Sequence, residues 1–269
     1  MARQNKECLN ARIEKEVVRG EGASHQALRA KIEKTQVRSK SYLLDLRIHS
    51  PSSLSCFNLD GIDTAPALVR LAKVKGLDAI AVTDYYSVDY LERVLHAAQG
   101  SNVVVISGVM IRCAAHGCDD IVLSCLFGEP GGCGRARELL RILEVPSQAR
   151  GCCDYIISLS FKQVLDIIEA LGGIAVPSRM DKTPSRKAVI KVLVEKYGFR
   201  AFDLAYYPES IQYFKENWPK LNFQFFNFSS ATALAQVGNR CSRVKMPQPG
   251  FEGIKLVASR ELAASVLEE

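Results

Sequence analysis

From residue 43 onward, short runs rich in Val, Ile and Leu alternate with longer segments whose apolar positions repeat at helical spacing. The short runs predict strands over 43–48, 78–83, 103–107, 121–126, 173–177, 200–205 and 222–227. The longer segments predict helices over 64–75, 88–98, 134–143, 161–171, 185–197 and 208–216. Repeated alternation of strand and helix is typical of an α/β fold with a parallel sheet, either open or closed into a barrel.

Two parts of the chain depart from this alternation. In residues 109–126, two strand-like runs flank a short polar turn that contains His116 and Gly117, which indicates a β-hairpin inserted in the series. Residues 1–40 instead carry apolar side chains at helical spacing, with a break near Gly20, and they predict two short helices. The chain therefore divides into a helical extension over 1–40 and one α/β domain over 41–269.

Composition and charge narrow the class of protein. With 48% hydrophobic and 24% charged residues, the 269-residue chain has the composition of a folded globular protein. The net charge of +6 is concentrated in residues 1–40, which hold ten Lys or Arg and five Glu. We interpret this segment either as a solvated helical arm or as a basic arm that contacts a nucleic acid, an acidic partner or a second subunit.

The location of the protein follows from its apolar runs and its cysteines. No run reaches the ~18 apolar residues that a membrane span needs, and the first residues are too charged for a secretory signal. The chain has nine cysteines, an odd number, and it is large enough to be stable without disulfides, so we expect most of them to be reduced and buried. We therefore expect a cytoplasmic protein without a membrane partner.

Polar residues follow the predicted strands at the edge where α/β folds carry their chemistry. Arg47 and His49 end the first strand, and Asp84 and Tyr85 follow the second. The later strands contribute polar positions of the same kind: Ser178, Arg179, Asp203, Ser229, Ser230 and Thr232. We expect these side chains to meet at one end of the sheet.

Several segments also follow one another in a familiar order. Asp45 to Ser50 reads DLRIHS, Ala72 to Tyr85 reads AKVKGLDAIAVTDY, and Ser107 to Ile111 reads SGVMI. Further on, the chain reads GGIAVPSR over 172–179 and SSAT over 229–232, followed by Val237-Gly238. Over roughly residues 42–260 the chain thus resembles the PHP (polymerase and histidinol phosphatase) family of metal-dependent phosphoesterases. The resemblance implies a distorted (βα)7 barrel of the TIM type.

Active members of that family hold divalent metals in a ring of His, Asp and Glu side chains, and the matched positions of this chain have lost most of them. The substituted positions are Arg47, Tyr85, Met110, Ser178, Ser230 and Thr232. His49 remains, with Asp84 and Asp203 as nearby carboxylates. Because catalytic metals usually take at least three protein ligands, we expect no metal cofactor here, and if any metal binds, His49 and Asp84 are its candidate ligands.

Arg47 itself suggests a different use of the site. A guanidinium stays protonated in proteins, repels a metal cation and offers a planar fork of donors to phosphate or carboxylate. Together with Tyr85 and Arg179 it could form an anion-binding site. Alternatively, Arg47 pairs with Asp84 or Asp203 and closes the end of the barrel.

Two other patterns carry less information. Cys113, His116 and Cys118 could ligate zinc, but their spacing favours the turn of the hairpin. Residues 131–134 (GGCG) lack the Lys-Ser/Thr of a phosphate-binding loop.

The sequence therefore predicts a divergent PHP-like protein that is catalytically impaired or inactive. It would act as a binding or scaffolding module for a phosphorylated ligand or a nucleic acid. The alternative is an active phosphoesterase in which His49, Asp84 and Asp203 hold Mn, Fe or Zn and which hydrolyses a nucleotide, a nucleic-acid end or a small phosphate ester.

Overall fold

The computed structural model describes residues 39–50 and 63–261. The helical extension predicted over residues 1–40 lies almost wholly outside the described residues, and it stays a prediction. None of the helices in the described segments is long and apolar enough to cross a membrane. The elements in chain order are β1 (Lys40–Ile48), α3 (Ala65–Val74), β2 (Ala79–Val82), α4 (Asp89–Ala97), β3 (Val104–Ala115), β4 (Cys118–Phe127), α5 (Gly132–Ile142), η1 (Ser147–Ala149), α6 (Phe161–Ala170), β5 (Ile174–Pro177), α7 (Pro184–Glu195), β6 (Ala201–Asp203), α8 (Ile211–Asn217), β7 (Gln224–Phe226), η2 (Leu234–Gln236), β8 (Ser242–Met246) and α9 (Phe251–Ala258).

The predicted alternation of strands and helices is confirmed over most of this range. The hairpin is also confirmed: β3 and β4 are antiparallel, and His116 and Gly117 form the turn with φ values of 50° and 78°. The strand predicted over 103–107 and the first strand-like run of the hairpin predicted over 109–126 form the single long strand β3. Two elements, β8 and α9, were not predicted, because five alternating residues and one short helix at the end of the chain give a weak periodic signal.

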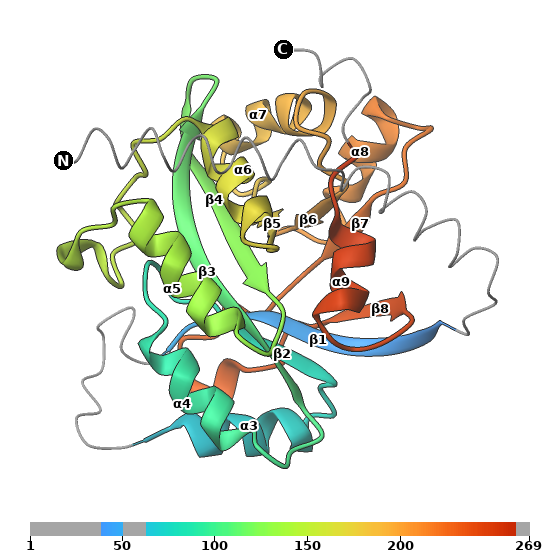
Figure 1. The fold of residues 1–269 in the computed structure, drawn as a ribbon. Coiled ribbons are helices and arrows are strands. Elements are labelled where there is room, and N and C mark those ends of the chain that lie inside the picture. The colour runs from blue at the N-terminus through green and yellow to red at the C-terminus, as the bar shows by residue number, and fades with distance from the viewer. Residues whose placement is uncertain (1–38, 51–62, 262–269) are drawn as a thin grey trace. The chain divides into compact units, whose positions relative to one another are not determined.

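The strands form a curled mixed sheet, a half-barrel, with helices packed on its outer face (Figure 1). Six strands are ordered β5-β4-β3-β2-β1-β8, with β1, β2 and β3 parallel and the other pairs antiparallel. β6 and β7 form a separate parallel pair. Single bridges at Ser178–Asp203 and Ile48–Ala231 join this pair to β5 and β1 near the carboxyl ends of those strands.

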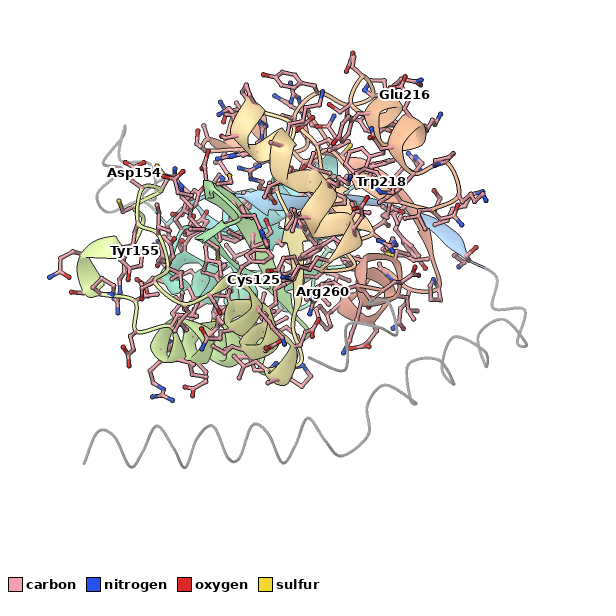
Figure 2. All side chains as sticks on the ribbon, turned by 90° about the horizontal axis from the view of Figure 1, so that it is seen from above. Cys125, Asp154, Tyr155, Glu216, Trp218 and Arg260 are labelled. Carbon is pink, nitrogen blue, oxygen red and sulfur yellow. The ribbon has the colours of Figure 1, made fainter. Side chains whose placement is uncertain are left out.

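Alternation along the strands divides the apolar side chains into two clusters. One cluster lies inside the curl of the sheet, where Leu44, Leu46, Ala81, Ile106 and Phe226 meet residues of α9. The larger cluster lies between the sheet and the surrounding helices, and it contains the fully buried Cys125 of β4 (Figure 2). The inner cluster fills the interior of the half-barrel up to the edge where the parallel strands end.

A buried carboxylate connects the first strand to the end of the domain. Asp45 in β1 is fully buried and accepts hydrogen bonds from the main-chain N–H groups of Ser229 at 3.1 Å and Gly238 at 3.0 Å. Burial raises the pKa of Asp45 to about 6, although these hydrogen bonds oppose the shift. Asp45, which opens the first motif of the sequence, therefore positions the loop that follows β7 against β1.

Candidate functional site at the mouth of the half-barrel

The side chains that face the inside of the half-barrel are apolar along the strands and become polar at the carboxyl ends of the strands. In β2 and β5, Ala81 and Val176 of the inner cluster are followed two residues later by Thr83 and Ser178. We call this edge the mouth of the half-barrel, and define it by Arg47, His49, Thr83, Asp84, Tyr85, Ser178, Arg179, Asp203 and Ser230. The structure therefore brings together most of the site residues that the sequence singled out.

An ion pair between Arg47 and Asp203 crosses the mouth. The Nη1 atom of Arg47 lies 3.1 Å from Oδ2 of Asp203, and the two side chains are 8% and 2% exposed. Asp203 also accepts a hydrogen bond from the N–H of Phe228 at 3.2 Å. Burial raises the pKa of Asp203, whereas the guanidinium of Arg47 lowers it by stabilising the carboxylate. Of the two carboxylates that the sequence offered to Arg47, the structure pairs it with Asp203.

His49 and Tyr85 lie together beside this pair. Their rings are nearly parallel, with centroids 6.0 Å apart, and both side chains are buried. Burial and the nearby positive charge of Arg47 lower the pKa of His49 to about 3, so this imidazole is neutral near pH 7. Burial raises the pKa of Tyr85. Asp84 accepts a hydrogen bond from the N–H of Ser50 at 2.6 Å, which ties the second strand end to the first.

Several polar atoms of the mouth are buried without a hydrogen-bond partner among the described residues. They are Nε of Arg47, Nδ1 of His49, Oγ1 of Thr83 and Oγ of Ser230. The cavity beside them is small: a space of about 10 Å³ is lined by His49 together with Ile48, Leu68, Tyr90 and residues 232–234 and 237. Such a space holds about one water molecule, so a larger ligand would have to bind at the rim of the mouth.

These residues do not fit a cluster of divalent metals. Within residues 39–50 and 63–261, no group of three or more His, Cys, Asp or Glu side chains is arranged to hold a metal ion. Asp203 is paired with Arg47, and the positive charges of Arg47 and Arg179 both lower the pKa of His49. Burial is the larger cause of the lowered pKa of His49, but the positive charges of the two arginines would also repel a metal cation at this position.

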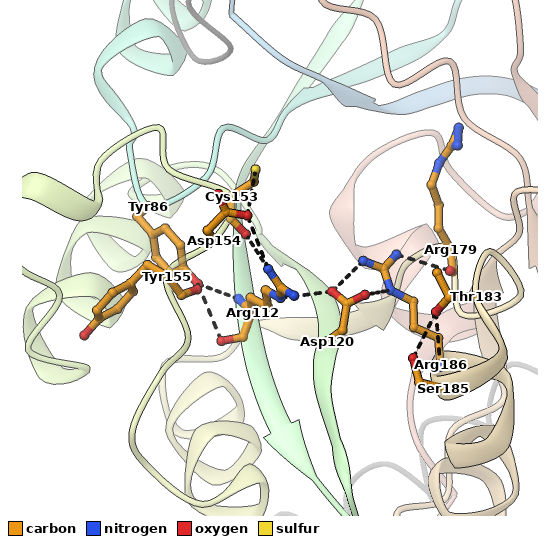
Figure 3. A network of polar contacts seen from close by, with 10 residues as sticks. All are labelled: Tyr86, Arg112, Asp120, Cys153, Asp154, Tyr155, Arg179, Thr183, Ser185 and Arg186. Carbon is orange, nitrogen blue, oxygen red and sulfur yellow. Dashed lines mark hydrogen bonds and ion pairs between the residues drawn. The ribbon is translucent and has the colours of Figure 1, made fainter.

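A second polar network stands next to the mouth (Figure 3). Asp120 of β4 accepts two hydrogen bonds from Arg186 of α7, at 2.7 and 2.8 Å, and pairs with Nε of Arg112 at 2.9 Å. Arg186 also donates to the carbonyl of Arg179 at 3.4 Å, while Arg112 donates to the carbonyl of Cys153 at 3.1 Å. The network thus ties the hairpin, the start of α7 and the loop after β5 to one another.

The network also helps to hold the main chain of Arg179 in place. Arg179 has a φ of 53°, in the left-handed region that a non-glycine residue seldom adopts. Its N–H donates to the carbonyl of Asp203 at 2.6 Å, and its carbonyl accepts from Arg186. Its side chain extends away from the Asp120 network, as Figure 3 shows. Sequence reasoning missed Arg112, Asp120 and Arg186, because Asp120 and Arg186 are 66 positions apart and Arg112 meets Asp120 only through the register of the hairpin.

Comparison with known proteins agrees with the fold and the order of the motifs. The family model described as PHP domain matches residues 45–200, which is more than half of the chain. The mixed α/β half-barrel with its polar mouth is the architecture expected of that class. The chain belongs to the PHP domain family. A search of curated proteins finds no similar sequence.

Solved structures show the same fold at low sequence identity. A protein from Bifidobacterium adolescentis, classed as a metal-dependent phosphoesterase, shares 12% identity with a TM-score of 0.52, over 82% of this chain and 97% of that one. PsfC from Pseudomonas syringae shares 15% identity with a TM-score of 0.51, over 84% and 93%. An amidohydrolase from Chromobacterium violaceum with bound sulfate and no metal shares 13% identity with a TM-score of 0.52, over 74% and 90%.

The buried pair predicts a strong coupling between Arg47 and Asp203. Replacing Arg47 with Met leaves the Asp203 carboxylate buried without its partner, and we expect the free energy of unfolding to fall by about 3–5 kcal/mol. The double variant Arg47→Met/Asp203→Asn removes both charges and keeps an acceptor for Phe228, so it should recover much of that loss. Urea denaturation of wild type, both single variants and the double variant measures the coupling. Equal losses in Arg47→Met and in the double variant would contradict it.

The lowered pKa of His49 predicts a specific dependence of stability on pH. Because the folded state binds the proton at about pH 3 and the unfolded state at about 6.5, the unfolded state holds more protons between these values. The contribution of His49 to stability is therefore complete above pH 6.5 and falls by up to about 1.4 kcal/mol per pH unit as the pH drops toward 3. His49→Gln should flatten the curve in this window, and the exposed His96→Gln should not. Identical curves for wild type and His49→Gln would show that the site leaves the imidazole free to titrate.

Proposed function

We propose that this chain is a PHP module that binds a phosphate-bearing ligand at its mouth through arginine side chains and does not hydrolyse it with a metal cluster. The observation that carries this proposal is the guanidinium of Arg47 inside the mouth. It supplies a permanent positive charge where members of the family hold metal ligands. The module would then serve as a binding or scaffolding unit.

Arg179 supplies the accessible part of this site. Its side chain is half-buried and forms no hydrogen bond or ion pair with the described residues. Burial and the neighbouring Arg47 lower the pKa of Arg179, which still remains protonated near neutral pH because a free guanidinium ionises above about pH 12. A half-buried cation without an ion pair is stabilised by an anion, and phosphate matches the donor fork of arginine.

The unpartnered hydroxyls and the fold neighbours give further support. Thr83 and Ser230 each hold a buried hydroxyl that can donate to a water molecule, and such a water can bridge to a phosphate at the rim. The amidohydrolase from Chromobacterium violaceum is described with bound sulfate, a tetrahedral anion of the same shape as phosphate. Since that protein shares only the fold with this chain, it supports the proposal by analogy.

The anion site predicts that the protein binds inorganic phosphate through Arg179. Titration calorimetry of the full chain should show saturable binding, and Arg179→Gln should weaken it by at least about tenfold through loss of a charged donor. The exposed Arg243, which lies on β8 opposite Leu43 near the other end of β1, offers a matched control. Arg243→Gln removes the same charge and should leave the affinity unchanged. If both variants bind phosphate equally weakly, the affinity depends only on the net charge of the protein, and the proposed site at Arg179 is wrong.

The loss of the metal ligands predicts a protein without phosphatase turnover. After incubation with Mn, Fe or Zn, elemental analysis should find less than one metal per chain, and a generic phosphate ester should not be hydrolysed. Arg47→His should not restore turnover, because Tyr85, Met110 and Ser178 still supply no comparable ligands. Stoichiometric metal with turnover in the wild type would favour the active phosphoesterase instead, with His49, Asp84 and Asp203 around the metal.

A further inference from the structure

A larger cavity lies where α8 ends and β7 begins. It has a volume of about 470 Å³, which is within the range of ~300–1,000 Å³ that is usual for small-molecule sites. Its lining comes from residues 214–225, so it belongs to the amino end of β7. The mouth is formed at the carboxyl ends of the strands, and none of its residues lines this cavity. The cavity is therefore separate from the proposed phosphate site.

Aromatic side chains form much of the wall of this cavity, and they are Phe214, Trp218, Phe223 and Phe225. The ring centroid of Phe214 lies 5.2 Å from that of Phe223 and 4.9 Å from that of Phe225, and the last two rings are within 20° of parallel. The indole N–H of Trp218 donates to Glu195 of α7 at 3.1 Å, which holds the indole in place. Phe223 and Phe225 are only half-buried, so part of each ring remains for contact with a ligand. Such a wall favours stacked or edge-to-face contact with another aromatic ring.

Lys215 supplies the charge of the cavity. Its side chain is exposed, and no ion pair or hydrogen bond joins its ammonium group to another described residue. The neighbouring Glu216 instead accepts from Gln212 at 2.8 Å, and Glu195 accepts from the indole of Trp218. Among the described residues, no acidic side chain lines the cavity. An apolar wall with one cation complements an apolar ligand that carries a negative charge.

We propose that this cavity binds a small planar aromatic carboxylate, with its ring against Trp218 and Phe223 and its carboxylate on Nζ of Lys215. One lysine is a single point charge, which matches a singly charged carboxylate better than a phosphate that carries nearly two charges. The site is independent of the proposed function, because the phosphate of that proposal binds at the mouth.

The test uses the fluorescence of Trp218, the only tryptophan of the chain, as a signal from the cavity itself. Titration of the full chain with naphthoate should change this fluorescence saturably. Naphthamide has the same rings without the charge, and cyclohexanecarboxylate has the charge without a planar ring. Each should bind at least about fivefold more weakly than naphthoate. A naphthoate titration without a saturable change, or equal affinities for naphthoate and either of the other two ligands, would overturn the proposal.

Two lysine variants then locate the carboxylate. Lys215→Met keeps an apolar stem and removes the charge, so it should reduce the affinity for naphthoate to that for naphthamide. Lys220→Met is the matched control, because Lys220 is exposed and close in sequence but does not line the cavity. It should bind naphthoate as the wild type does. Equal weakening in the two variants would contradict the assignment of Lys215.

Inorganic phosphate separates this proposal from the proposed function. Both lysine variants should bind phosphate as the wild type does, because Arg179 is unchanged in them. A protein that binds phosphate but not naphthoate would refute the aromatic site alone, and one that binds naphthoate but not phosphate would refute the anion site alone.

Discussion

The mouth of the half-barrel is organised by two opposite charges that have been removed from water. Arg47 and Asp203 come from β1 and β6, 156 positions apart, and each is stable in its buried position only because the other is present. The same Asp203 accepts from the main chain of Phe228, and its carbonyl receives the N–H of Arg179. One ion pair therefore orients the ends of β1, β5, β6 and β7 relative to one another.

Two arginine side chains determine the electrostatic character of the mouth. Burial and the positive charges of Arg47 and Arg179 lower the pKa of His49 and keep its imidazole neutral near pH 7. Membership of the PHP family thus establishes the fold, and the function must be argued from the side chains at the mouth.

The sequence alone predicted most of the elements, though not β8 and α9, and the edge on which the polar residues gather, because these follow from local periodicity and from the topology of parallel strands. It left the partner of Arg47 open between two carboxylates, since that choice depends on the curl of the sheet. It also missed the contact of Asp120 with Arg112 and Arg186, which needs the register of the hairpin against α7.

The hydrogen bonds of Asp45 have a consequence for the order in which the chain folds. Its two main-chain donors, Ser229 and Gly238, follow it by 184 and 193 positions, and β8, which pairs with the first half of β1, lies later still. During synthesis, β1 emerges from the ribosome long before any of these partners exist, so one edge of the first strand stays unpaired until residues 242–246 have been made. Closure of the half-barrel is therefore a late event. A chain that ends before residue 229 would leave one edge of β1 unpaired and the carboxylate of Asp45 without its main-chain donors.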